Sequence, residues 1–247
     1  MINTLNIRRH LSEGQKKTIK RLLRVFLSLV PSKSNLQILA LKHGTDKISH
    51  GYIEHYEKIL SGIRKRKMNI LEIGVGGYND PKSGGNSLRM RQEYFPNSMI
   101  YSIDIYDKSE LQDNRIKIFQ GSQNDKDFLN NISKSIGLYD LIIDDGSHEN
   151  EHIITSFNVL FPYLKDEGFY IIEDLHTSYD PNFGGDSIDL NNLNCAWALL
   201  KSFTDGLNFQ YISKWTPSFI CENIVSMFFF PQIVFIKKGR NKQQIII

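Results

Sequence analysis

The chain has 247 residues, of which 40% are hydrophobic and 23% are charged, a composition that excludes disorder and repeated membrane spans for the chain as a whole. This length suits one α/β domain with a full core and is barely enough for two. The net charge of +3 is local, because residues 1–35 hold eight of the 30 Lys and Arg residues and one of the 27 acids. Cys195 and Cys221 form no CxxC motif, so we expect buried free thiols in a reducing compartment.

The basic N-terminal segment predicts an amphipathic helix. Large apolar residues follow helical spacing between residues 18 and 30, while most basic side chains fall elsewhere on the helix. The apolar run is too short to cross a bilayer, so we predict a packing or dimerisation helix. Peripheral binding to an anionic membrane through residues 1–35 is the open alternative. We predict a basic helical extension over residues 1–40 and a cytoplasmic protein, at the inner face of the membrane if that alternative holds.

Short apolar runs alternate with helical segments from residue 68 onward. Such runs are typical of strands that helices cover on both faces, and the alternation predicts a doubly wound, mostly parallel α/β sheet with right-handed crossovers. The predicted strands cover residues 68–75, 99–105, 115–121, 139–145 and 168–174. The predicted helices lie near residues 86–95, 124–136, 149–164 and 191–205. Two further strands are predicted at one edge of the sheet, over residues 208–215 and 232–239.

Polar residues follow each predicted strand, at the edge where open α/β sheets bind ligands. The first strand runs into a turn with Gly74, Gly76 and Gly77, where the backbone can approach a ligand closely. A dinucleotide fingerprint needs a further glycine where the chain has Asn79, which weakens the case for NAD. Asp104, at the end of the second strand, can accept hydrogen bonds from both hydroxyls of a ribose. These features indicate an adenosine-type ligand, with a purely structural turn as the alternative.

Acidic residues crowd the ends of the fourth and fifth predicted strands. Asp145 ends one strand, and Glu173 and Asp174 end the next, so adjacent parallel strands bring these carboxylates into one region. Like charges this close are unfavourable without a cation, and carboxylates suit Mg²⁺ or Mn²⁺. His148 can take a proton near neutral pH, which predicts a general base beside the metal. The alternatives are helix caps or lysine pairs for the acids, and a capping or surface role for His148.

The segments HGTDK, LEIGVGGYNDPKSGGNSLRM, YSIDIYDKS, LIIDDGSHEN and IIEDLHTSYDPNFGG follow one another between residues 43 and 185. Together they resemble the class I S-adenosylmethionine-dependent methyltransferases, which have a Rossmann-like fold, and among these the Mg²⁺-dependent sugar O-methyltransferases. The resemblance covers about residues 40–240 and identifies residues 41–247 as the methyltransferase domain. It implies an enzyme that transfers a methyl group from S-adenosylmethionine to a sugar hydroxyl, with Mg²⁺ or Mn²⁺ and a histidine base.

The resemblance also implies roles for individual residues. The implied cofactor-binding residues are Glu72, Gly74, Ser87, Asp104, Gln123 and Asp144. The implied metal ligands are Asp145, Glu173 and Asp174. His148 corresponds to the catalytic base, and His176 and Tyr179 fall in a segment that borders the acceptor in such enzymes.

The sequence leaves the acceptor and two rival functions open. An envelope glycan, a nucleotide-activated sugar and an antibiotic glycoside all fit, and the basic extension favours a role in polysaccharide biosynthesis. The rivals are a nonenzymatic, membrane-peripheral binding protein and a nicotinamide-dependent oxidoreductase. We expect no nucleic-acid partner, because the basic run over residues 61–67 has no interleaved aromatic residues. A homo-oligomer is expected if the N-terminal helix packs against a second chain.

Overall fold

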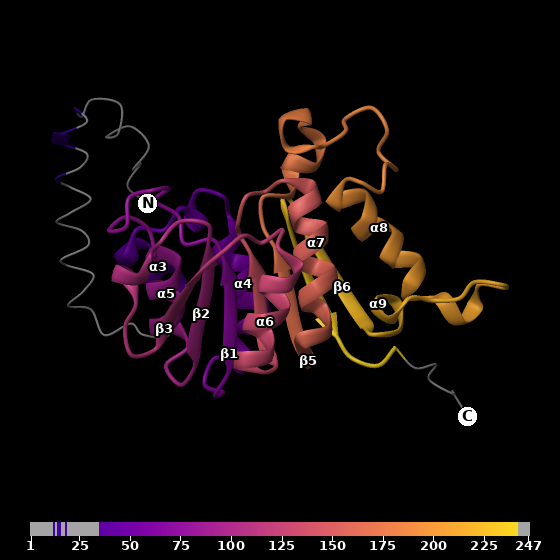
Figure 1. Ribbon diagram of the computed structural model, residues 1–247, viewed down its shortest axis with the longest axis horizontal. Helices are drawn as coiled ribbons and strands as arrows, with labels where there is room; N and C mark the ends of the chain where they lie inside the picture. The colour runs from indigo at the N-terminus through magenta and orange to yellow at the C-terminus, as the bar shows by residue number, and fades with distance from the viewer. Residues whose placement is uncertain (1–11, 13, 16–17, 19–34, 242–247) are drawn as a thin grey trace, which may run out of the picture.

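The computed structural model describes residues 12, 14, 15, 18 and 35–241 (Figure 1). At its centre is a seven-stranded sheet with the strand order β3-β2-β1-β4-β5-β7-β6. Strands β1 to β5 are parallel, whereas β7 is antiparallel to both β5 and β6. The strands are Asn69–Ile73 (β1), Met99–Asp104 (β2), Ile116–Gln120 (β3), Tyr139–Asp144 (β4), Leu164–Ile172 (β5), Ile224–Phe230 (β6) and Ile233–Lys238 (β7). The doubly wound, mostly parallel sheet expected from the sequence is confirmed.

The antiparallel edge differs from the prediction in one strand. The sequence predicts a strand over residues 208–215, but the structure has the short 3-10 helix Phe209–Tyr211 there. Strand β6 takes the edge instead and pairs with β7 across a tight turn between Phe230 and Ile233. Strands joined by so short a turn pair at little cost in chain entropy, so the nearer segment forms the hairpin. The second predicted edge strand is confirmed as β7.

Helices cover both faces of the sheet and enclose two hydrophobic cores. Helices α3, α4 and α5 pack on one face, and α6, α7 and α8 on the other, where Figure 1 shows α6 and α7 lying along the strands. The bounds are Leu36–His43 (α3), Tyr52–Leu60 (α4), Asn86–Tyr94 (α5), Lys126–Ile136 (α6), Asn150–Leu160 (α7), Ala196–Gly206 (α8) and Phe219–Glu222 (α9). Helices α5 to α8 were predicted near these positions, and the basic run over residues 61–67, which predicts a helix end, follows α4; α9 was not predicted.

The N-terminal extension lies almost entirely outside the described residues, and with it the apolar stripe predicted between residues 18 and 30. The predicted boundary at residue 40 falls inside α3, whose Leu36 and Leu39 are buried in the core. We therefore propose that the extension ends before α3. Both cysteines are free and buried, as predicted. No helix within the described residues is long and apolar enough to cross a membrane.

The segment between α3 and α4 closes the edge of the sheet at which β4 and β5 end. It holds Lys47, whose ammonium contacts Asp145 after β4, and α4 begins at Tyr52, which contacts Asp174 after β5. Ligands bind at this edge in open α/β sheets. The fold thus brings upstream residues to the predicted site.

Candidate functional site

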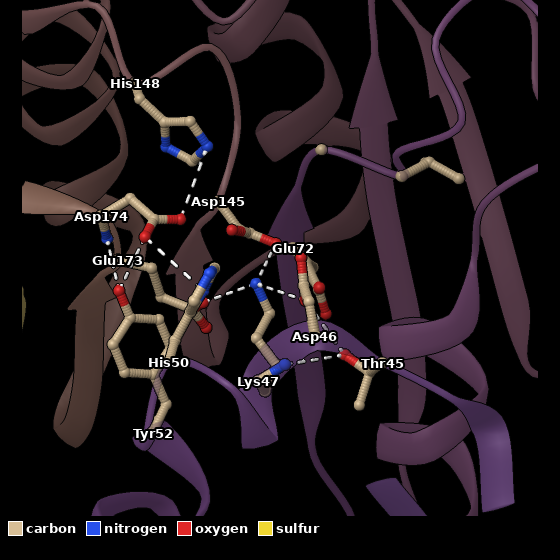
Figure 2. Close-up of polar contacts among 12 residues, drawn as sticks. Thr45, Asp46, Lys47, His50, Tyr52, Glu72, Asp145, His148, Glu173 and Asp174 are labelled. Atoms are coloured by element: carbon tan, nitrogen blue, oxygen red, sulfur yellow. Dashed lines mark hydrogen bonds and ion pairs between the residues drawn. The ribbon is translucent and has the colours of Figure 1, made fainter. Parts of the chain in front are cut away.

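Three predicted site residues meet at the carboxyl ends of β4 and β5 (Figure 2). Asp145 directly follows β4, Asp174 comes two residues after β5, and His148 lies in the turn that leads to α7. One ligand atom of each side chain, a carboxylate oxygen or an imidazole nitrogen, lies within 4.8 Å of the other two. His148 Nε2 is 3.7 Å from Asp174 Oδ2. Oxygen and imidazole donors at this spacing can hold a divalent metal ion.

Two of these residues have left-handed backbone conformations. The φ angle is 60° at His148 and 54° at Asp174. A residue with a Cβ atom adopts this conformation at a cost of about 1–3 kcal/mol, and such positions cluster at functional sites. Tyr52 holds Asp174 in place, because its hydroxyl donates to Oδ1 at 2.7 Å and accepts from the backbone N–H at 3.2 Å. The surrounding structure therefore fixes the Asp174 carboxylate.

A buried lysine reaches the same cluster. Lys47 is 2% exposed, and its Nζ lies 2.5 Å from Asp145 Oδ2 and 2.6 Å from Glu173 Oε2. Burial alone would lower the pKa of Lys47, but the carboxylates of Asp145, Glu173 and Asp46 raise it well above its ordinary value. Lys47 is thus a fixed cation between two predicted metal ligands. The sequence reasoning missed its role, although the HGTDK motif contains it.

Glu173, the third predicted metal ligand, is held by other contacts and is not part of the Asp145, His148 and Asp174 group. Its fully buried carboxylate accepts hydrogen bonds from Tyr56 at 2.5 Å and from Arg91 at 3.3 Å. Arg91 also pairs with the predicted cofactor residue Glu72, which is fully buried. The sequence reasoning missed this ion network. A charged residue on the apolar stripe of the predicted helix over 86–95 was the available signal.

His148 is suited to accept a proton. Burial lowers its pKa below 6.5, and although the Asp174 carboxylate acts in the opposite direction, Lys47 adds to the lowering. The imidazole is therefore neutral at pH 7, the form in which it can act as a base. His176, which follows Asp174 by two residues, is 57% exposed, and its Nδ1 lies 3.9 Å from Asp174 Oδ1. It faces the same carboxylate from the surface.

Gly74 joins the predicted cofactor turn to the acidic cluster. Its φ angle is 95°, and a Cβ atom there would lie 2.2 Å from the backbone oxygen of Asp145. Only glycine permits this approach. Asp104 holds the same turn, because its Oδ2 accepts from the N–H of Val75 and its Oδ1 from the N–H of Tyr106, both at 2.9 Å. The predicted cofactor and metal residues therefore adjoin.

A second buried lysine, Lys108, holds the rest of the glycine-rich loop after β1 through hydrogen bonds. Lys108 Nζ donates to the main-chain carbonyl of Asp80 at 2.6 Å and to that of Ser83 at 3.0 Å. These bonds link the segment after β2 to the loop after β1. Lys108 thus fixes the shape of the predicted cofactor loop.

The other predicted cofactor residues are bonded to groups of the protein. Gln123 donates to Asp144 at 3.2 Å and accepts from the N–H of Ser147 at 2.8 Å. Asp144 also accepts from the hydroxyl of Ser156 at 2.6 Å. Burial raises the pKa of Asp144 to about 6, although these hydrogen bonds act in the opposite direction. Ser87 is buried in the first turn of α5. Their roles toward a cofactor stay predictions.

An apolar pocket of about 480 Å³ includes Leu175 and His176, which directly follow Asp174 in the sequence. It contains both predicted acceptor residues, His176 and Tyr179, together with aromatic side chains from α8 and the hairpin of β6 and β7. Its lining residues are Leu175, His176, Tyr179, Trp197, Phe229, Phe230, Pro231 and Gln232. Aromatic faces of this kind pack well against the apolar faces of ring-shaped ligands.

No protein-family model matches the chain. Over 216 residues the chain is 39% identical to mycinamicin VI 2''-O-methyltransferase of Micromonospora griseorubida, a match that covers 85% of the chain and 54% of that protein. Over 207 residues it is 40% identical to 8-demethyl-8-alpha-L-rhamnosyl tetracenomycin-C 2'-O-methyltransferase of Streptomyces olivaceus, covering 82% of the chain and 54% of that protein. The chain is a homologue of these O-methyltransferases.

The solved structure of the MycE methyltransferase, in complex with Mg, SAH and mycinamycin VI, matches this fold with a TM-score of 0.82. The two chains are 40% identical, and the match covers 85% of this chain and 54% of MycE. The class I Rossmann-like methyltransferase fold and the resemblance predicted from the sequence motifs are thereby confirmed. The chain spans about half the length of the relatives that it matches.

Proposed function

We propose that the chain is an S-adenosylmethionine-dependent O-methyltransferase that acts on a sugar hydroxyl of a glycoside and uses a divalent metal ion. The observation that carries the proposal is the group of Asp145, His148 and Asp174 beside the glycine turn, in a chain that is 39% identical to a known O-methyltransferase. Catalysis needs both a place for the methyl donor and a means of deprotonating an alcohol. The described residues offer candidates for each.

The glycine turn and Asp104 fit the methyl donor, S-adenosylmethionine, which supplies an electrophilic methyl group. Each carboxylate oxygen of Asp104 accepts one backbone N–H, so each keeps a lone pair for a ribose hydroxyl. At Gly76, a Cβ atom would meet no atom within 4 Å, so the backbone of the turn is open to a ligand. Gly74, Glu72, Ser87, Gln123 and Asp144 would form the remaining walls. Gln123 and Asp144 would act mainly through shape, because their polar atoms are bonded within the protein, whereas Glu72 Oε1 is buried without a hydrogen-bond partner.

The carboxylates at the ends of β4 and β5 fit Mg²⁺ or Mn²⁺, which makes an alcohol proton easier to remove. Asp145 and Asp174 would hold the ion directly, since their oxygens approach one another and His148. Glu173 belongs to the predicted ligand set and is linked to Asp145 through Lys47, which both carboxylates contact. The orientation of Asp174 by Tyr52 prepares one ligand in advance.

His148 would take the proton of the acceptor hydroxyl. Its neutral imidazole can accept that proton, and the nearby Asp174 carboxylate stabilises the imidazolium that results. S-adenosylmethionine would supply the methyl group to the deprotonated acceptor oxygen, with its sulfur as the leaving group. His176 is the competing base, but it is more exposed and belongs to the wall of the apolar pocket. We assign it to acceptor binding together with Tyr179.

The pocket favours a glycoside over a nucleotide-activated sugar. Among its lining residues there is no lysine or arginine, whereas a diphosphate calls for cationic partners. Relatives named for glycosylated acceptors, such as rhamnosyl tetracenomycin C, agree with this choice. A nonenzymatic binding role and nicotinamide chemistry gain no support from the homologues. Membrane contact through residues 1–35 and a homo-oligomer stay predictions, because that segment lies largely outside the described residues.

The test is transfer of a labelled methyl group from S-adenosylmethionine to a panel of glycosides that includes mycinamicin VI. Transfer should stop in excess EDTA and return when Mg²⁺ or Mn²⁺ is added in excess of the chelator. His148→Ala should lower kcat by about a hundred- to ten-thousand-fold, and His176→Ala should mainly raise KM. Undiminished transfer in the chelator would contradict the metal assignment, and an unchanged kcat in His148→Ala would contradict the base assignment.

A further inference from the structure

We propose that Lys47 is a built-in counter-cation, which holds the carboxylate cluster together without a metal and competes with a divalent ion for Asp145. The proposal rests on the metal site put forward under the proposed function. Lys47 would therefore tune how tightly the metal is held, without itself being a ligand. Its ammonium lies within 2.6 Å of an oxygen of each of two predicted ligands, Asp145 and Glu173.

The charges of the cluster leave Asp145 dependent on Lys47. Arg91 forms ion pairs with Glu72 and Glu173. Among the described residues, Lys47 is the cation in contact with Asp145. Figure 2 shows the ammonium between the two carboxylates, at the end of a side chain that comes from the segment before α4. Removal of Lys47 would leave the half-buried carboxylate of Asp145 without its counter-ion. The positive charge that repels a cation at Asp145 would also be lost, which favours metal binding there.

A neighbour that hydrogen-bonds to a metal ligand can also strengthen metal binding by orienting that ligand. If Lys47 acted in this way, its replacement would weaken Mn²⁺ binding. Here other groups fix the backbone of Asp145 and the carboxylate of Asp174. The backbone N–H of Asp145 donates to the carbonyl of Ile73 at 3.0 Å, and Gly74 packs against the Asp145 carbonyl. Tyr52 fixes Asp174 through two hydrogen bonds. We therefore expect charge competition to outweigh the loss of orientation when Lys47 is replaced.

Lys238 is a matched control, because it is also buried and its hydrogen bonds go to backbone carbonyls. Its Nζ donates to the carbonyls of Phe161, Pro162 and Leu164, at the amino end of β5. Loss of its charge should destabilise the protein equally with and without metal. Lys47→Arg is a second control, since it keeps the positive charge beside Asp145.

The experiment measures Mn²⁺ binding by calorimetry and thermal unfolding in EDTA or saturating Mn²⁺, for the whole chain and its variants. Lys47→Met should bind Mn²⁺ at least about tenfold more tightly than the wild type, since one nearby unit charge is removed. Its Tm should fall in EDTA, and Mn²⁺ should raise it by more than it raises the Tm of the wild type. Lys47→Gln, a milder change, is measured alongside and should shift in the same direction. Lys47→Arg should stay within about threefold of the wild-type Kd, because the unit charge beside Asp145 remains.

Weaker or unchanged Mn²⁺ binding in both neutral variants would overturn the proposal. An equal loss of Tm in EDTA and in Mn²⁺, as expected for Lys238→Met, would show that Lys47 is only structural. If the wild type binds no Mn²⁺, the metal site of the proposed function itself fails. If the wild type binds Mn²⁺ but the Lys47 variants do not bind it more tightly, only the role of Lys47 fails.

Discussion

Replacement of Arg91 by methionine should lower the free energy of unfolding by about 3–5 kcal/mol, the usual cost of removing one partner from a buried ion pair. The arginine is 1% exposed and is the cation shared by Glu72 and Glu173, both of which are fully buried. It also stacks on the ring of Tyr56, with its guanidinium carbon 4.7 Å from the ring centre. The methionine side chain fills similar space, so the loss is mainly that of charge and hydrogen bonds.

The assay is urea denaturation at pH 7. With an m value of about 2.5 kcal/mol/M, a loss of 4 kcal/mol lowers the midpoint by about 1.6 M. Glu72→Gln in the same chain should recover part of the loss, because it removes the carboxylate that Arg91→Met leaves without a counter-ion, whereas Glu173 keeps Lys47. A coupling energy of about 1–3 kcal/mol between the two changes is expected from the double-mutant cycle.

Arg115 provides the control for this prediction. Its guanidinium donates to the main-chain carbonyls of Gln92, Phe95 and Ser98, so its removal leaves no buried carboxylate behind. Arg115→Met should therefore cost less than Arg91→Met and show no coupling to Glu72→Gln. A loss below about 1 kcal/mol for Arg91→Met would refute the reasoning, because removing the cation of a buried ion pair lowers the free energy of unfolding by about 3–5 kcal/mol.

Three further outcomes can be measured. Burial raises the pKa of Glu93, but hydrogen bonds from Lys42 outweigh this effect and leave the pKa below 4.5. The interaction of Glu93 with Lys42 therefore stabilises the fold above pH 4.5, and this stabilisation is lost as the pH falls through the folded pKa. Glu93→Gln should thus cost about 0.5–1 kcal/mol at pH 7 and less in acid, in urea denaturation across that range. Gly74→Ala should displace Asp145 and weaken both SAH and Mn²⁺ binding in calorimetry, whereas unchanged binding of either would contradict the close approach. Lys108→Met should weaken SAH binding by about tenfold with Mn²⁺ binding unchanged, since it frees only the glycine loop.

Much of the sheet was predictable because its parallel strands are covered on both faces. Mostly apolar runs mark β1 to β5, and helical segments of the right length separate most of them. The hairpin of β6 and β7 was only half predicted, because its aromatic residues resemble those of the nearby segment 208–215. A tight turn between Phe230 and Ile233 decided the pairing. Pro231 in this turn was the available signal, because proline is a preferred turn residue.

The acidic cluster was also predictable in outline. Asp145, His148 and Asp174 follow strands whose ends must share one edge, so their proximity follows from topology. The roles of Lys47 and Arg91 could not be found in this way. Lys47 lies 98 positions before its partner Asp145, and no periodicity links residues so far apart. Side-chain pairing across the fold needs the packed structure.

Binding of SAH to the purified chain tests the central claim most directly, because it needs no knowledge of the acceptor. Calorimetry should show one site for SAH, and Asp104→Ala should weaken it by about a hundredfold, since two charge-assisted hydrogen bonds of about 1.5 kcal/mol each are lost. NAD should give no heat. Absence of heat with SAH at millimolar concentration, or equal affinity in wild type and Asp104→Ala, would contradict the account.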